Sequence, residues 1–280
     1  MFVPALLLLI AGSVAAQSAD PSASRVVETV MTETPAGEFV DGQLDWTDGV
    51  LMVTGEGVAP ESISNAVQQR LLGFRAAKID AYRKLLEVVG GVQVDARTTV
   101  SMSMVANDTI RATVEGLVRG ATVVPGSRRQ EEGVYLLDLQ LRLLEGLSEA
   151  VLPDSLPSFD AVPAELPMAD SVIVFVPDEP FTGLIVDARG TSLKPSLSPK
   201  IIDETGRVIY SATHVDRQFA LRTGVVGYER ELTSAAVNPR IGGEHAHPKV
   251  VAALRADGLY NSDAVVSRDT GTRIKMADSE

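Results

Sequence analysis

One long amphipathic helix constrains the fold of this 280-residue chain more than any other feature. Between residues 63 and 88 the apolar residues recur three and four positions apart, which is the spacing of one buried stripe on an α-helix. They are Ile63, Ala66, Val67, Leu71, Phe74, Ala77, Ala81, Leu85 and Val88. Ser62 is the expected N-cap residue, and Gly90-Gly91 ends the helix with residues that tolerate positive φ. Such a stripe packs against a sheet or another helix.

The segments around this helix predict an α+β domain over residues 46–144. The expected elements are strands at 50–57 and 92–96, a second helix at 104–118, and strands at 121–129 and 133–143. A turn at Gln130-Glu131-Glu132 joins the last two strands. In the last strand every second residue from Leu137 to Leu143 is Leu, which is typical of a half-buried antiparallel strand. The expected order is β-α-β-α-β-β, with the helices on one face of the sheet.

The C-terminal half is predicted to be a separate, β-rich domain over residues 171–280. Four prolines between Pro153 and Pro167 disfavour regular structure, so residues 145–170 are the expected interdomain linker. The expected strands are 172–176, 182–188, 200–203, 208–210, 249–254, 264–267 and 273–276. Hairpin turns are expected at 203–206 and 269–271, and only 228–236 looks helical.

The N-terminal residues predict export. Residues 1–16 have the pattern of a signal peptide, because an apolar run from Ala5 to Ala11 leads into Val14-Ala15-Ala16, small residues that a signal peptidase accepts before Gln17. The run is shorter than the roughly 20 residues of a transmembrane helix. Residues 17–45 are rich in Ser, Ala, Thr and Glu with little periodicity, which predicts a flexible tether. We therefore expect a periplasmic protein whose mature chain begins at Gln17.

Composition and motifs argue against several classes of function. The chain has 37 acidic and 25 basic residues and a formal net charge of -12, so it repels phosphate backbones, and nucleic acid is not an expected partner. It has no Cys, which excludes disulfides and thiolate chemistry. Gly55-Glu56-Gly57 follows a predicted strand, but Pro60 stands where a dinucleotide fingerprint needs its third glycine. No phosphate loop or Gly-x-Ser-x-Gly motif occurs. We expect no cofactor and no enzymatic activity.

Two local clusters are candidate sites. Asp187 and Arg189 end a predicted strand, and with Lys194 they can bind a ligand carboxylate or phosphate. The favoured interpretation of Asp187 and Arg189 is an ion pair that fixes a turn. His245 and His247 lie two residues apart and are a weak candidate for a metal site, or for a hydrolase, but the sequence supplies no third strong ligand. The favoured interpretation there is a solvated loop.

Several segments resemble the LPP20 lipoprotein family, which includes flagellar outer-ring proteins of the FlgP type. They are Thr54-Gly55-Glu56-Gly57, the run from Arg75 to Leu85, Gly91-Val92, and the run from Gly116 to Ala121, so the resemblance covers about residues 50–143. The run from Thr182 to Ile201 is similar to a module that follows this domain in some exported bacterial proteins. The resemblance implies a non-catalytic α+β domain in the bacterial envelope, assembled into rings beneath the outer membrane in the flagellar members.

One departure from this family affects attachment. Family members are commonly lipidated on a Cys after the leader, and this chain has none. We therefore expect no direct lipid anchor, and attachment through self-assembly or through envelope or flagellar proteins. The leading hypothesis is an exported structural or assembly protein, in the periplasm or at the outer membrane, in a flagellum-associated ring. The alternative is a periplasmic binding module for a small anion, held by the C-terminal domain.

Overall fold

The computed structural model describes residues 6–10, 25–34, 36–152 and 181–277. These residues form two compact units. The N-terminal unit spans residues 25–151, and the C-terminal unit combines residues 6–10 with the described residues after 151. Both helices and strands contribute to the chain, which confirms the α+β class.

The N-terminal unit is built on an antiparallel sheet. Its strands are β2 (Val27–Glu33), β3 (Phe39–Asp45), β4 (Val50–Gly57), β5 (Thr122–Val123), β6 (Arg129–Glu131) and β7 (Val134–Arg142). They follow the order β2-β3-β4-β7-β5, and β6 also pairs with β7. The longest pairing joins β4 to β7, from Val50 opposite Arg142 to Gly57 opposite Tyr135. The predicted alternation in β7 is confirmed, because Leu137, Leu139 and Leu141 are buried.

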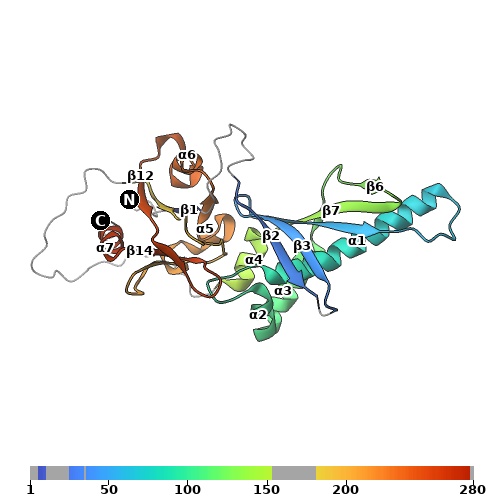
Figure 1. Ribbon diagram of the computed structural model, residues 1–280, viewed down its shortest axis with the longest axis horizontal. Coiled ribbons are helices and arrows are strands. Elements are labelled where there is room, and N and C mark those ends of the chain that lie inside the picture. The colour runs from blue at the N-terminus through green and yellow to red at the C-terminus, as the bar shows by residue number, and fades with distance from the viewer. Residues whose placement is uncertain (1–5, 11–24, 35, 153–180, 278–280) are drawn as a thin grey trace, which may run out of the picture. The chain divides into compact units, whose positions relative to one another are not determined.

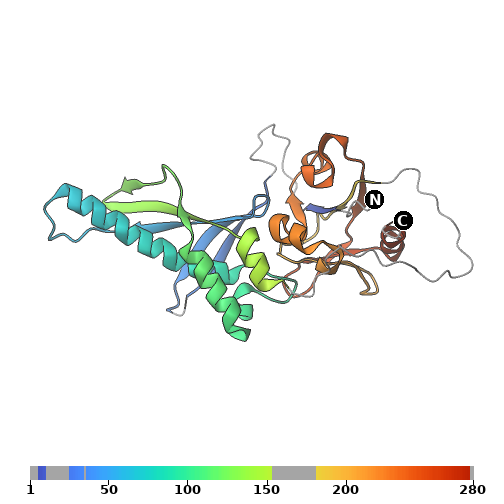
Figure 2. The same cartoon turned by 180° about the vertical axis from the view of Figure 1, so that it is seen from behind.

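Helices cover one face of this sheet, as predicted (Figures 1 and 2). They are α1 (Ala66–Gly91), α2 (Val100–Ala106), α3 (Asp108–Arg119) and α4 (Leu144–Val151). The buried stripe of α1 runs through Gly73, Ala77, Ala81, Leu85 and Val88 and packs on β4 and β7. Small residues on both elements let the helix lie close to the strands.

The prediction of a flexible tether up to residue 45 is wrong for residues 27–45, which form β2 and β3. Val30, Val40 and Leu44 point into the core, and the alternate positions, which include Thr29, Glu33, Asp41 and Gln43, are exposed. The polar composition therefore belongs to the solvent face of a hairpin. Residues 11–24 of the predicted leader and tether lie outside the described residues.

Several further boundaries differ from the prediction. The expected helix at 104–118 is two helices, α2 and α3, that meet at Asn107, and within the expected strand at 121–129 only residues 122, 123 and 129 belong to strands. Residues 92–96 form no strand, because the backbone turns at Asp95, whose Oδ1 accepts hydrogen bonds from the N–H groups of residues 97 and 98. Helix α1 begins later than predicted, with Asn65 as its N-cap. The hairpin turn lies at Glu132-Gly133, where both residues have positive φ. Residues 144–151 form α4, so the predicted linker begins too early, and residues 153–170 lie outside the described residues.

The C-terminal unit contains two four-stranded sheets. The first has the parallel order β11-β1-β8-β12 and the second the mixed order β10-β9-β14-β13. The strands are β1 (Leu6–Ile10), β8 (Gly183–Asp187), β9 (Ile201–Asp203), β10 (Val208–Tyr210), β11 (Gly227–Glu229), β12 (Pro248–Ala252), β13 (Arg255–Asp257) and β14 (Asp263–Val266). The helices are α5 (Arg217–Thr223), α6 (Leu232–Ala236) and α7 (Arg268–Ala277), and the 3-10 turns are η2 (Ala212–His214), η3 (Pro239–Ile241) and η4 (Gly243–His245).

Most predicted strands of this unit are present, but its last segment is not a strand. The predicted turn at 269–271 and strand at 273–276 lie inside helix α7. A Cβ added to Gly271 would lie 2.8 Å from the Ile209 side chain, so this glycine allows α7 to approach β10 and does not mark a turn. The predicted helix at 228–236 divides into β11 and α6, and α5 was not predicted. The predicted strand at 172–176 lies outside the described residues.

The apolar run of the predicted leader forms strand β1. It lies between β8 and β11, with Leu6 opposite Gly183 and Ile10 opposite both Asp187 and Glu229. Removal of residues 1–16 would leave β8 and β11 without their shared neighbour. No helix in the described part of the chain is long and apolar enough to cross a membrane.

Candidate functional site

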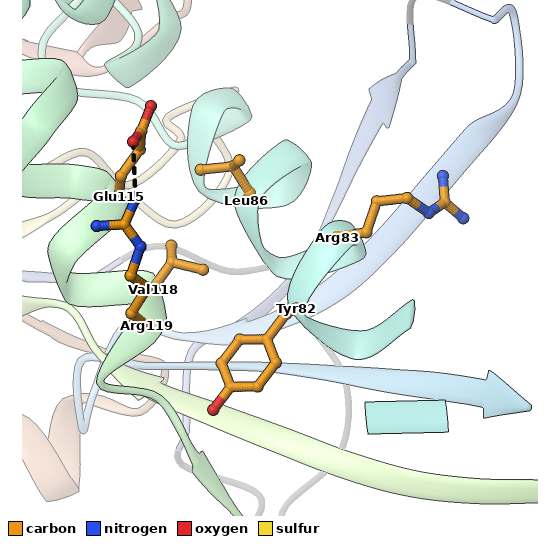
Figure 3. A pocket seen from close by; sticks show the side chains of 6 residues that line it. All are labelled: Tyr82, Arg83, Leu86, Glu115, Val118 and Arg119. Atoms are coloured by element: carbon orange, nitrogen blue, oxygen red, sulfur yellow. Dashed lines mark hydrogen bonds and ion pairs between the residues drawn. The ribbon is translucent and has the colours of Figure 1, made fainter. Parts of the chain in front are cut away.

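A surface groove in the N-terminal unit lies between α1 and α3 (Figure 3). It has a volume of about 530 Å³ and is lined by Tyr82, Arg83, Leu86, Glu115, Val118 and Arg119. Leu86 on α1 and Val118 on α3 provide apolar walls, and charged side chains form the rim.

The rim of the groove is held by ion pairs. Arg119 donates to Glu115 at 3.2 Å, one turn away on α3. Arg83 pairs with Asp80 at 3.0 Å, and Lys84 reaches the same carboxylate at 3.1 Å. Burial raises the pKa of Asp80, but hydrogen bonds from the Glu56 N–H, Arg83 and Lys84 outweigh it and leave the pKa below its ordinary value. The carboxylate therefore stays ionised.

Tyr82 fixes the end of the groove nearest the sheet. Its hydroxyl donates to the carbonyl oxygen of Ala121 at 3.2 Å, and the Lys78 ammonium lies 5.6 Å from the centre of its ring. The hydrogen bond anchors α1 to the residue that follows the C-cap of α3, and the contact with Lys78 lies within α1. The six lining residues include no Ser or His, so they supply no nucleophile and base of the kind used in acyl transfer.

The structure brings Asp187 and Arg189 together at the end of β8. The Arg189 side chain donates to Asp187 through Nε at 2.9 Å and through a terminal nitrogen at 2.7 Å, and its backbone N–H donates at 3.1 Å. These hydrogen bonds from Arg189 lower the pKa of the Asp187 carboxyl. The following Gly190 has φ of 83° and completes the turn. This two-point pairing is the geometry expected of an ion pair that fixes a turn.

The other predicted site residues lie apart from this pair. Among the described residues, no hydrogen bond or ion pair joins Lys194 to Asp187 or Arg189; the Lys194 backbone N–H donates to the Asn261 carbonyl, and its side chain is exposed. His245 ends η4, and His247 lies just before β12, where its backbone pairs with Thr182. Neither histidine therefore lies in a strand. Within the described residues, no three His, Cys, Asp or Glu side chains cluster closely enough to hold a metal ion.

Two charged residues of the C-terminal unit were missed by sequence reasoning. Arg240 is largely buried and donates to the carbonyl oxygens of residues 223, 224 and 225, while its guanidinium lies 5.0 Å from the Phe219 ring centre. Burial lowers the pKa of Arg240 to about 10. Asp203 accepts hydrogen bonds from the Thr205 hydroxyl and from Arg207, which lower its pKa to about 2. Asn238-Pro239 before Arg240, and the Asp-x-Thr-Gly turn, are the local signals for these two positions.

Each unit matches a known type of domain. The N-terminal unit is a two-layer α+β domain with a groove on its helical side, and the C-terminal unit is a strand-rich module. Residues 60–139 match the LPP20 lipoprotein family. Residues 183–280 match the second domain of Treponema pallidum Tp0624. The chain therefore carries an LPP20-like domain followed by a Tp0624-like module, which confirms the resemblance.

Each candidate site lies within one of the two matched segments. The groove lies wholly within the LPP20 match, and the pair formed by Asp187 and Arg189 lies within the Tp0624 match. The LPP20 match supports an exported protein associated with the envelope. A comparison with curated proteins gives no match to the chain.

Proposed function

We propose that this chain is a non-catalytic structural protein of the bacterial envelope, and that it self-assembles through its LPP20-like unit. The observation that carries the proposal is the distribution of exposed apolar side chains. Eight large apolar residues among the described ones are more than 60% exposed, and seven of them belong to residues 25–151. The seven are Met31, Phe39, Val58, Val67, Leu71, Ile79 and Val105.

This distribution supports assembly where exposed apolar side chains lie side by side, because contiguous apolar patches are typical of interaction surfaces. The first two turns of α1 show it most clearly. Val67 and Leu71 lie one turn apart on the helix and are both exposed, although the sequence pattern predicts them as core. An exposed leucine removed from water at an interface contributes roughly 1.5–3 kcal/mol.

The finer part of the proposal concerns place and partners. We assign the protein to the periplasm, in contact with the outer membrane through its own assembly or a partner, because the chain has no Cys that could carry a lipid. The flagellar members of the LPP20 family form rings, so a flagellum-associated ring is the specific assembly to test. Fractionation of cells with and without flagella, followed by immunoblotting, tests both statements.

The alternative function, binding of a small anion through Arg189, receives less support. The Arg189 guanidinium already has a carboxylate partner in Asp187, at 2.7 and 2.9 Å. An incoming anion would have to compete with that carboxylate. The ligand proposal stays open to a thermal-shift test with phosphates and carboxylates.

Light scattering coupled to size-exclusion chromatography tests assembly directly. The full chain should form oligomers whose mass rises with concentration, and Leu71→Asp should weaken them because it places a charge on an apolar contact surface. Leu259→Asp is the matched control, since Leu259 is 73% exposed in the other unit. A full chain that stays monomeric at the highest soluble concentration would refute the proposed function.

A further inference from the structure

We infer that copies of this chain associate head to tail, with the outer sheet face of one N-terminal unit docking on the helical face of the next. The sheet face consists of the outward side chains of β2, β3 and β4, chiefly Val27, Met31, Glu33, Phe39, Asp41 and Met52. The helix face consists of Leu71, Leu72, Arg75, Lys78, Ile79 and Arg83 on α1, with Arg119 on α3. The inference rests on the proposed function and specifies which surfaces it uses.

The sheet face combines apolar and acidic side chains. Phe39 is 68% exposed and lies opposite Glu33, while Met31 is 64% exposed and lies opposite Asp41. The outward positions of the three strands carry four acidic residues, Glu33, Asp41, Asp45 and Glu56, and no Lys or Arg. Asp45 pairs with Arg25 and Glu56 with Lys84, so Glu33 and Asp41 supply the charge beside Met31 and Phe39. This surface therefore combines apolar and acidic side chains. It lies on the side of the sheet that helices α1 to α4 do not cover (Figures 1 and 2).

The helix face has the opposite charge. Helix α1 carries five basic and two acidic residues, a surplus of three positive charges. Arg75, Lys78 and Arg83 are exposed; Arg83 pairs with Asp80, so the excess charge on this face comes mainly from Arg75 and Lys78. Leu72, Ile79 and Leu86 lie seven residues apart, so they follow one side of the helix, away from the buried Ala77 and Ala81. Ile79 is 63% exposed, and Leu86 continues the row into the groove between α1 and α3 (Figure 3).

The charges on the two faces favour a sheet-to-helix contact between two chains over a contact between two like faces. Two helix faces would place basic residues against basic residues, and two sheet faces would place acidic residues against acidic ones. Like charges brought together across an interface disfavour association, and opposite charges favour it. The two faces lie on opposite layers of one domain, so their pairing leaves a free face at each end. Such a heterologous contact closes into a ring or extends into a filament.

Two charge-changing variants of the full chain test the inference. Phe39→Lys puts a cation on the sheet face, and Ile79→Glu puts an anion on the helix face. Each variant alone should associate at least about tenfold more weakly than the parent, because its altered face repels the native face it must contact. Mixing the two variants should restore association, because the native helix face of the first meets the native sheet face of the second. Leu259→Glu is the control and should assemble like the parent.

Sedimentation velocity of the parent, each variant and the mixture gives distinct outcomes. If Phe39→Lys assembles like the parent, the sheet face is not used and the contact is helix to helix. If Ile79→Glu assembles like the parent, the helix face is not used and the contact is sheet to sheet. Either result overturns the inference and leaves the proposed function intact. A mixture that stays monomeric also overturns it. A monomeric parent overturns both. Association should weaken between 50 and 500 mM salt, as expected for contacts between exposed charges (screening length about 10 Å at 0.1 M).

Discussion

Gly55 on strand β4 should control the stability of the N-terminal unit, because it allows helix α1 to lie directly on the sheet. A Cβ added to Gly55 would overlap the carbonyl oxygen of Ala77 and come within 2.5 Å of the Ala81 Cβ. The overlap is with helix backbone, which has no rotamer to change. Gly55→Ala therefore requires the whole helix to move away from β4.

The expected cost follows from this geometry. Introducing one methyl group into a closely packed core typically costs about 1–3 kcal/mol. We expect the upper part of that range for Gly55→Ala, because α1 also contacts β7 and cannot move from one strand alone. Gly116→Ala on α3 is the matched control, since no atom lies within 4 Å of its added Cβ. It should stabilise the unit by up to about 1 kcal/mol, because alanine favours the helix interior over glycine.

Urea denaturation of the full chain, followed by far-ultraviolet circular dichroism, measures both effects. The transition of the N-terminal unit should move to lower urea for Gly55→Ala and to higher urea for Gly116→Ala. If Gly55→Ala is as stable as the parent, the close packing of α1 on β4 is wrong. If both variants lose stability alike, the loss reflects the removal of glycine in general.

Three further predictions concern single side chains. Phe74→Ala should destabilise the N-terminal unit by about 1–3 kcal/mol in urea denaturation. This is less than the loss of a fully buried aromatic side chain, because Phe74 is only half-buried and the substitution removes mainly its edge contact with the Tyr135 ring, at 5.1 Å between ring centres. Arg189→Ala should lower the free energy of unfolding by at most about 1 kcal/mol, because the ion pair with Asp187 is partly exposed. This difference from the parent should vanish as the pH falls through the lowered pKa of Asp187. A thermal shift with one anion in the parent but not in the variant would instead favour a ligand site. Asp203→Asn should lower the melting temperature at pH 7, and the difference from the parent should shrink as the pH falls from about 4 to 2, because the carboxylate contributes stability only while it is ionised.

The sequence predicts elements well where one periodicity dominates. Strand β4 has the predicted bounds of 50–57, and the leucines of β7 alternate as expected. Strand β2 was missed because it buries only Val30 fully and because its apolar residues, Val27, Val30 and Met31, do not alternate with polar ones. Its position at the edge of the sheet accounts for this, since an edge strand contacts the core on one side only.

The groove and the exposed faces could not be predicted, because they depend on where one element ends over another. The sequence pattern of α1 continues from Ile63 to Val88, but burial begins at Gly73. A helical period tells which residues share a face and not how far the covering sheet extends. Similarly, Leu86 and Val118 become neighbours in the groove only because α3 packs beside α1.

The N-terminal apolar run is a second case in which a sequence pattern does not determine the structure. Five apolar residues from Leu6 to Ile10 suit the core of a signal peptide, and they suit equally a parallel strand that is buried on both faces. The structure uses them as β1, paired on both sides by β8 and β11. If the leader is removed on export, the backbone groups of those two strands lose their partners, and unpaired strand edges inside a sheet are costly. Residues 6–10 therefore cannot both be removed by cleavage before Gln17 and complete the parallel sheet. The difference in unfolding free energy between the full chain and a chain that begins at Gln17 measures how much β1 stabilises the C-terminal unit.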